Sequence, residues 1–116
     1  MTTGYRLGVA LEYRAKQLLE ADGYFVVRAA ASKGVVDLAA MQPGQLLLVQ
    51  CKRSGALPPA EWNELYDLAA RLGAVPVMAV KGLRGTQFHR LTARKDGSRR
   101  RQPMEPFTTD QVGEQA

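Results

Sequence analysis

Apolar residues recur at helical spacing near the start of the chain. Between residues 5 and 22 they fall at every third or fourth position, which predicts an amphipathic helix. The apolar stripe consists of Leu7, Leu11, Ala15, Leu18 and Leu19. Asp22-Gly23 follows the stripe, and glycine favours the left-handed backbone that ends many helices. The first predicted element is therefore a helix with one buried face.

Three strands are predicted next, at residues 24–29, 35–40 and 46–52. Their residues are mainly aliphatic, aromatic or β-branched, and small-residue or Pro-Gly turns separate them. The third strand is almost continuously apolar, which indicates a central strand covered on both faces. Its side chains alternate between those faces. One face holds Leu47, Val49 and Cys51, and the other holds Leu46, Leu48, Gln50 and Lys52.

The second half of the chain predicts a helix at residues 60–72 and strands at residues 75–81 and 86–91. The apolar stripe of this helix consists of Trp62, Leu65, Ala69 and Leu72. The order α-β-β-β-α-β-β predicts an α/β fold, with a mixed β-sheet flanked by helices and a right-handed crossover through the second helix. We expect one folded domain at residues 1–91, followed by a basic, polar, weakly ordered tail at residues 92–116.

Composition agrees with one domain of 116 residues, 46% of them hydrophobic. No apolar run is long enough for a membrane span, and the N-terminus lacks the apolar core of a signal peptide. The single Cys51 cannot form an internal disulfide, which fits a reducing compartment. We therefore expect a cytoplasmic protein (in the host cytoplasm if the source is viral), with Cys51 as a buried residue.

Positive charge is concentrated late in the chain. Residues 81–101 contain eight Lys or Arg and one Asp, so the remaining residues hold eight Lys or Arg (16 less 8) and ten Asp or Glu (11 less 1). This distribution indicates a polyanionic partner, although a solvated basic tail has the same composition. The candidate phosphate contacts are Arg6, Lys33, Arg53, Lys81, Arg84 and Arg90.

Several catalytic classes are excluded. His89 is the only histidine, Cys51 has no histidine-based activating system, and zinc-ligand spacing is absent. The chain also lacks a Gly-x-Ser-x-Gly elbow, a phosphate-binding P-loop and a dinucleotide fingerprint. We expect no nucleotide cofactor.

The polar residues Asp37, Gln50 and Lys52 interrupt apolar strands, where desolvation makes them costly. A carboxylate and an amide oxygen are suitable ligands for a hard cation. Glu12 can add a second carboxylate if its helix packs beside the strands, or it can form a surface pair with Lys16. An ammonium group beside a metal can orient water and offset charge on a phosphoryl group. These residues predict metal-dependent phosphodiester hydrolysis.

The pattern Glu12, Gly34-Val-Val-Asp37, Gln50-Cys-Lys52 resembles the PD-(D/E)xK signature of restriction-endonuclease-like nucleases. More narrowly, residues 4–91 resemble archaeal-type Holliday junction resolvases. The further matching segments are Leu18-Leu19, Gly23-Tyr24-Phe25-Val26-Val27-Arg28, Ser32-Lys33-Gly34 and Arg71-Leu72-Gly73-Ala74-Val75-Pro76-Val77.

The resemblance implies a homodimer that binds four-way DNA junctions in recombination and repair and makes paired nicks with Mg²⁺. Asp37 and Gln50 would be metal ligands, Glu12 a nearby acid, and Lys52 the water-orienting base or electrostatic stabiliser. Ser32 would be a hydroxyl at the edge of the site, or simply a loop hydroxyl bound to backbone. Arg28 and Lys33 would contact phosphates.

Similar resolvases carry glutamate where this chain has Gln50. A neutral amide attracts a cation less strongly, because one negative charge is lost. We expect an active enzyme that uses Mg²⁺ or Mn²⁺. The alternatives are a non-catalytic protein that binds branched DNA and a general nuclease of the same fold.

Dimerisation is a separate expectation. Trp62 and Tyr66 on the second helix are candidates for part of the interface. Aromatic residues at helical spacing are also common in the core of a single chain.

Overall fold

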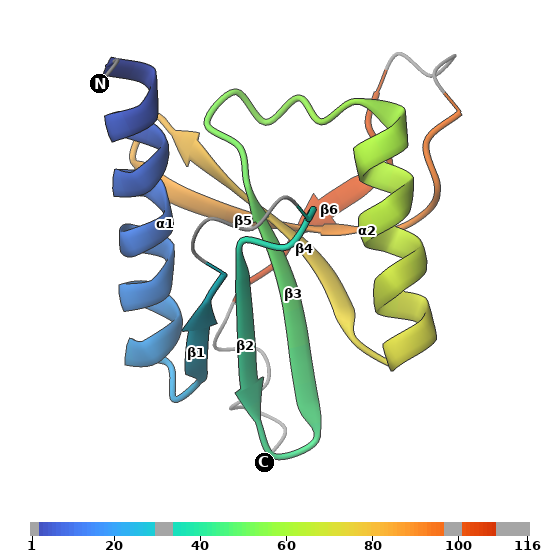
Figure 1. Ribbon diagram of the computed structural model, residues 1–116, viewed down its shortest axis with the longest axis horizontal. Helices are drawn as coiled ribbons and strands as arrows, with labels where there is room; N and C mark the ends of the chain where they lie inside the picture. The colour runs from blue at the N-terminus through green and yellow to red at the C-terminus, as the bar shows by residue number, and fades with distance from the viewer. Residues whose placement is uncertain (1–2, 30–33, 97–100, 109–116) are drawn as a thin grey trace.

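A computed structural model describes residues 3–29, 34–96 and 101–108, with side chains from residue 7 onward. The described residues form two helices, each followed along the chain by three strands (Figure 1). They are α1 (Thr3–Ala21), β1 (Phe25–Arg28), β2 (Leu38–Gln42), β3 (Gln45–Cys51), α2 (Pro59–Leu72), β4 (Val75–Gly82), β5 (Gly85–Leu91) and β6 (Met104–Pro106). The predicted α/β class and order are confirmed, and a sixth strand is added.

The six strands form one mixed sheet in the order β1-β2-β3-β4-β5-β6. Only β3 and β4 pair in parallel, and the other neighbours are antiparallel. A parallel pair needs a crossover, which α2 supplies between these two strands. Helix α2 ends at Gly73, whose φ of 68° lies in the left-handed region that glycine adopts without strain.

The two helices cover opposite faces of the sheet (Figure 1). Helix α1 packs Ala15 and Leu19, both fully buried, against alternate residues of the first four strands. Helix α2 packs Trp62, Leu65 and Ala69 against the other face. We call these two groups the α1-face core and the α2-face core. The helices bury most of the apolar stripes predicted for them, but the terminal stripe residues Leu7 and Leu72 are 39% and 53% exposed, so that part of the prediction is wrong.

Strand β3 supplies both cores, as its continuous apolar run predicts. Leu47 and Val49 belong to the α1-face core, whereas Leu48 belongs to the α2-face core. By the same alternation, Gln50 and Lys52 share the face of Leu48. All three aliphatic side chains are at most 5% exposed, so this strand lies at the centre of the protein.

Strand β2 begins one residue after Asp37, so the prediction that Asp37 lies in mid-strand is wrong. The backbone of Asp37 is nevertheless hydrogen-bonded to both neighbouring segments. The Asp37 amide donates to the Val49 carbonyl at 2.8 Å, and its carbonyl accepts from the Ala29 amide at 2.8 Å. Asp37 is therefore fixed between β1 and β3 at the edge of the regular pairing.

The expectation of a weakly ordered tail is wrong for residues 101–108. Strand β6 pairs with β5, and Phe107 is 9% exposed in the α1-face core. The Phe107 amide donates to the Phe88 carbonyl at 2.9 Å. Pro103 and Phe107 are buried and Met104 is partly buried. The mainly polar composition of this segment gave no indication of this packing. Arg99 and Arg100 lie outside the described residues.

Trp62 is fully buried within its own chain, so the prediction that it forms a dimer interface is wrong. Its indole nitrogen donates to the Ala93 carbonyl at 2.8 Å, as a buried indole requires. Tyr66 is partly exposed beside it. Within the described ranges, neither helix is long and apolar enough to cross a membrane.

Candidate functional site

The sheet topology brings the predicted site residues to one end of the sheet. Strands β1 and β3 both run antiparallel to β2, so their final residues lie together beside the start of β2. Arg28 ends β1, Asp37 precedes β2, and Gln50 and Lys52 lie at the end of β3. Leu38 pairs with Val49, and the Asp37 amide donates to the Val49 carbonyl, so Asp37 lies beside the end of β3.

The Asp37 carboxylate is held by the backbone of the neighbouring strand. Its Oδ2 atom accepts a hydrogen bond from the Cys51 amide at 2.8 Å. Burial raises the pKa of Asp37, and the negative charge of Glu12 raises it further. The Cys51 amide and the positive charges of Arg28 and Lys52 act in the opposite direction. A carboxylate whose ionised form is disfavoured in this way gains from a nearby cation.

The side-chain carbonyl of Gln50 is the second oxygen at this site. Its Oε1 atom is buried and accepts no hydrogen bond from any residue that the structure describes. Leaving a buried acceptor without a partner costs about 1–3 kcal/mol. An unsatisfied amide oxygen is a suitable ligand for a hard divalent cation.

Glu12 lies close enough to Asp37 to influence its pKa, but it is already paired. Glu12 Oε1 accepts a hydrogen bond from Arg28 Nε at 2.9 Å, and both side chains are about four-fifths buried, being 21% and 22% exposed. Lys16 instead pairs with Glu20 at 2.7 Å. The alternative of a Glu12–Lys16 surface pair is therefore wrong.

Arg28 makes a second contact that sequence reasoning missed. Its guanidinium carbon lies 4.8 Å from the centre of the Tyr13 ring, a cation–π distance. Tyr13 follows Glu12 directly on α1, so one helical turn supplies both partners of Arg28. Tyr13 is half exposed. Nothing in the sequence around it indicates a cation–π contact with Arg28.

The side chains of Asp37 and Gln50 carry oxygen atoms of the kind that a hard cation binds, and Glu12 is a further acid whose charge reaches Asp37. Among the described residues, no group of three His, Cys, Asp or Glu side chains could hold a metal ion. A site here would therefore depend on the amide oxygen of Gln50 in addition to carboxylates. That requirement agrees with the buried, unpartnered Oε1 atom.

Lys52 follows β3 directly and is partly buried. Its backbone amide donates to the Ala79 carbonyl at 2.9 Å, which continues the β3–β4 pairing by one step. Its positive charge reaches Asp37, since it lowers the pKa of that carboxyl. The Asp37 carboxylate and the Lys52 ammonium group, two of the groups predicted to act together, thus lie within electrostatic range of each other.

Cys51 is not a nucleophile in this arrangement. Burial raises the pKa of its thiol far above the ordinary value, and the charges of Asp37 and Glu12 raise it further. The side chain packs partly buried against the α1-face core. A protonated thiol is unreactive, so the prediction of a packing role for Cys51 stands.

Three predicted residues cannot be located in the site. Ser32 and Lys33 lie outside the described residues. Arg6 lies in α1, but its side chain is not described. Their roles stay predictions.

Three predicted DNA contacts share the end of the sheet that holds the site. Arg53, Lys81 and Arg84 are exposed, and the Lys81 amide donates to the Arg53 carbonyl at 3.4 Å. Arg84 lies in the turn between β4 and β5. Arg90 pairs with Val77, which itself pairs with Val49, so Arg90 lies in the middle of the sheet and not at that end.

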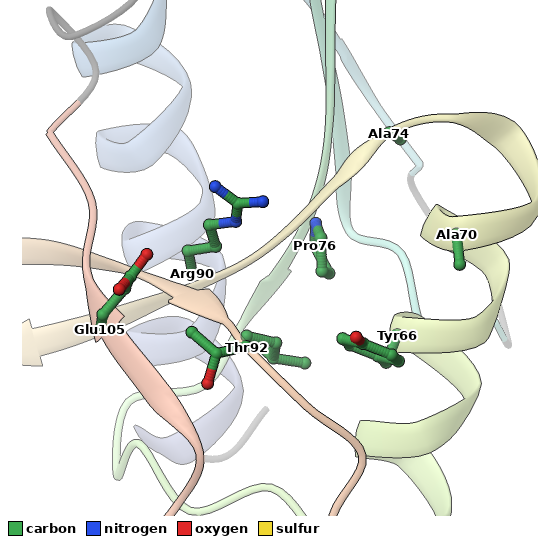
Figure 2. Close-up of a pocket in the computed structure, with 8 residues that line it drawn as sticks. Tyr66, Ala70, Ala74, Pro76, Arg90, Thr92 and Glu105 are labelled. Carbon is green, nitrogen blue, oxygen red and sulfur yellow. The ribbon is translucent and has the colours of Figure 1, made fainter.

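Figure 2 shows the cavity beside Arg90, which has a volume of about 340 Å³. Tyr66 and Ala70 border it from α2, and Arg90 and Glu105 border it from the strands. None of the predicted metal ligands lines this cavity. The proposed chemistry belongs to the other end of the sheet.

Comparison with known proteins places the chain in a family. The family model described as archaeal Holliday junction resolvase (Hjc) matches residues 3–101. The crossover junction endodeoxyribonuclease Hjc of Methanocaldococcus jannaschii is 36% identical over 81 residues, which cover 66% of this chain. Those residues span 60% of that relative's length.

The solved structure of Archaeoglobus fulgidus Hjc, a Holliday junction resolvase, has the same fold. The two superpose with a TM-score of 0.63 and 18% identity, over 87% of this chain and 98% of the other. The family model covers most of the sequence and includes Glu12, Asp37, Gln50 and Lys52. The chain belongs to the archaeal Holliday junction resolvase family.

Proposed function

We propose that this protein is a metal-dependent endodeoxyribonuclease that resolves four-way DNA junctions. The observation that carries the proposal is the part-buried Asp37 carboxylate, which the Cys51 amide holds within reach of the Lys52 charge. Gln50, at the end of the same strand as Cys51, adds a buried oxygen that has no hydrogen-bond partner among the described residues. Family membership supports the junction as the substrate. The name of the Methanocaldococcus relative supports endonuclease activity on DNA.

Each residue has a distinct part in the proposed hydrolysis. Asp37 and Gln50 would hold Mg²⁺, or Mn²⁺ in its place, and Glu12 would lie beside them. A bound divalent ion supplies positive charge to the phosphoryl oxygens and lowers the pKa of a coordinated water. The Lys52 ammonium orients the attacking water and stabilises the charge that develops on the phosphate. The Cys51 amide keeps Asp37 in position throughout.

The Glu12–Arg28 pair has a supporting part in the same proposal. The pair gives Glu12 a fixed orientation near Asp37 and balances its charge. The bond to Glu12 uses the Nε hydrogen of Arg28, so the terminal nitrogens of the guanidinium can donate to a phosphate oxygen. This arrangement supports both the predicted acid role of Glu12 and the predicted phosphate contact of Arg28.

The exposed cations near the site support a DNA-binding surface. We expect a Lys81→Gln, Arg84→Gln double variant to bind a four-way junction about 3–10-fold more weakly and to show a shallower salt dependence, because each phosphate contact releases counterions. Fluorescence anisotropy over a range of salt concentrations measures both effects. Arg71→Gln is the control, since Arg71 is an exposed cation in the last turn of α2, which leads into the start of β4. An equal loss in the control would contradict this placement of the DNA.

A homodimer supports paired nicking, because each protomer contributes one site. Phe25 and Val27 lie on β1, the first strand of the sheet, and are 69% and 46% exposed. Exposed apolar side chains on an edge strand are suited to burial against another chain. We expect light scattering at micromolar concentration to give the mass of two chains, and Phe25→Glu to shift it toward one. Leu72→Glu changes an exposed leucine at the end of α2 and serves as the control. A monomeric wild type would exclude this dimer.

Two other functions remain distinguishable by experiment. A general nuclease of this fold would cut linear duplex DNA as readily as a junction of the same sequence. A non-catalytic branched-DNA-binding protein would bind the junction tightly and leave it intact with either Mg²⁺ or Mn²⁺. The proposal requires cleavage of the junction in clear preference to a matched linear duplex.

A further inference from the structure

The chain after β5 returns across α2 to the loop that follows Lys52. We call residues 92–96 and 101–103 the C-terminal strap. In Figure 1 the orange chain that leaves β5 passes along α2. The two parts of the strap are joined by the Thr92 amide, which donates to the Pro103 carbonyl at 2.8 Å. The strap thus begins and ends beside the sheet edge formed by β5 and β6.

Two side chains of the strap bind backbone carbonyls in the loop between β3 and α2. Gln102 Nε2 donates to the Gly55 carbonyl at 2.6 Å. Lys95 Nζ donates to the Leu57 carbonyl at 2.7 Å. The two side chains also bind each other, since Lys95 Nζ donates to Gln102 Oε1 at 2.8 Å. The Lys95 ammonium is placed further by the ring of Trp62, whose centre lies 5.0 Å away.

The same loop fixes the backbone of Lys52. The Gly55 amide donates to the Lys52 carbonyl at 2.9 Å and closes a tight turn. Gly55 has a φ of 72°, and a Cβ built on it would lie 3.3 Å from Val80 Cγ1. Gly55 therefore connects Lys52 on its amide side to Gln102 on its carbonyl side. Loss of the Gln102 bond would free the carbonyl side of this turn.

Other strap contacts lead to α2 and not to the loop. Asn63 exchanges two hydrogen bonds with the Lys95 backbone, at 2.6 and 2.9 Å. The Arg94 guanidinium forms an ion pair with Asp67, and both side chains are more than half exposed. These contacts attach the strap to α2 independently of the Gly55 carbonyl. Attachment of the strap to α2 and positioning of the Lys52 turn can therefore be tested by separate variants.

We propose that Gln102 and Lys95 are positioning residues that hold the Lys52 turn in the geometry used for cleavage. The inference rests on the proposed role of Lys52 in phosphodiester hydrolysis. A polar group that fixes a functional residue through its backbone commonly changes rate by about 10–100-fold when it is removed. The sequence alone conceals this role, because 43 positions separate Lys52 from Lys95 (95 less 52).

The test compares Gln102→Met and Lys95→Met with Asp67→Asn in the full chain. Each methionine keeps an unbranched side chain but removes the bonds to the loop, whereas Asp67→Asn weakens only the ion pair to α2. Single-turnover cleavage of a four-way junction and junction affinity are measured for each variant. Amide hydrogen exchange of the segment 51–57 is measured by mass spectrometry without DNA.

We expect both methionine variants to cleave about tenfold more slowly with junction affinity within twofold of the wild type. Exchange in segment 51–57 should accelerate in both, while Asp67→Asn leaves rate and exchange unchanged. Unchanged exchange in both methionine variants, or equal acceleration in Asp67→Asn, would overturn the inference. If the wild type does not cleave, the proposed function fails, and the exchange comparison still decides whether the strap holds the turn.

Discussion

Asp37→Asn and Lys52→Ala are each expected to reduce junction cleavage by about 10²–10³-fold or more. Asp37→Asn removes the charge of a proposed metal ligand, and Lys52→Ala removes the ammonium group proposed to stabilise the charge that develops on the phosphate. Neither change removes the exposed cations Arg53, Lys81 and Arg84, so junction binding should persist. Single-turnover cleavage and anisotropy on the same labelled junction measure the two effects separately.

The melting temperature of Asp37→Asn shows whether a loss of cleavage is caused by unfolding, and the pKa of Asp37 predicts its direction. Its pKa is raised in the folded protein, chiefly by burial, so ionisation of this carboxyl disfavours folding without metal. The resulting loss of stability grows as pH rises through the folded-state pKa and disappears below the unfolded-state value. At pH 7 in chelator, Asp37→Asn should therefore melt at the same temperature as the wild type or higher. Loss of cleavage together with a large fall in Tm would point to unfolding instead of chemistry.

Gln50→Glu is expected to lower the Mg²⁺ concentration needed for half-maximal cleavage by about tenfold. A unit charge 4 Å from another contributes about 4 kcal/mol at an effective dielectric constant of 20. Burial of the new carboxylate offsets several kcal/mol of this attraction. A net gain of about 1.4 kcal/mol corresponds to tenfold tighter binding. Titration of cleavage rate against Mg²⁺ measures the change.

Gln45→Glu is the matched control for this variant. It adds the same charge to the same strand, but at the first residue of β3 and not near its end. It should leave the Mg²⁺ dependence unchanged. If Gln50→Glu also leaves it unchanged, the Gln50 oxygen does not bind the metal. A similar shift in both variants would indicate a general effect of net charge.

The hydrophobic periodicity of the sequence was sufficient to predict most of the helices and strands and the faces that they bury. The alternation along residues 46–52 predicted which aliphatic side chains of β3 face each core. The polar interruption of apolar strands identified Asp37 as a candidate site residue, because desolvation makes such residues expensive. These predictions depend on neighbours in sequence, where periodicity is informative.

The failures arose where distant segments meet. Glu12 has Lys16 one turn away, yet Arg28 on β1 is its partner, because α1 packs against that strand. Strand β6 exists through pairing with β5 and burial of Phe107, neither of which its polar surroundings reveal. Trp62 was ambiguous between interface and core, since helical spacing is the same for both. Tertiary packing decided each case.

Cleavage of a labelled four-way junction by the wild-type protein tests the central claim most directly. The reaction is followed with Mg²⁺, with excess chelator, and beside a linear duplex of matched sequence. We predict paired nicks in opposing strands of the junction with Mg²⁺, none with chelator, and little cleavage of the duplex. An intact junction with both Mg²⁺ and Mn²⁺, despite tight binding, would contradict the account.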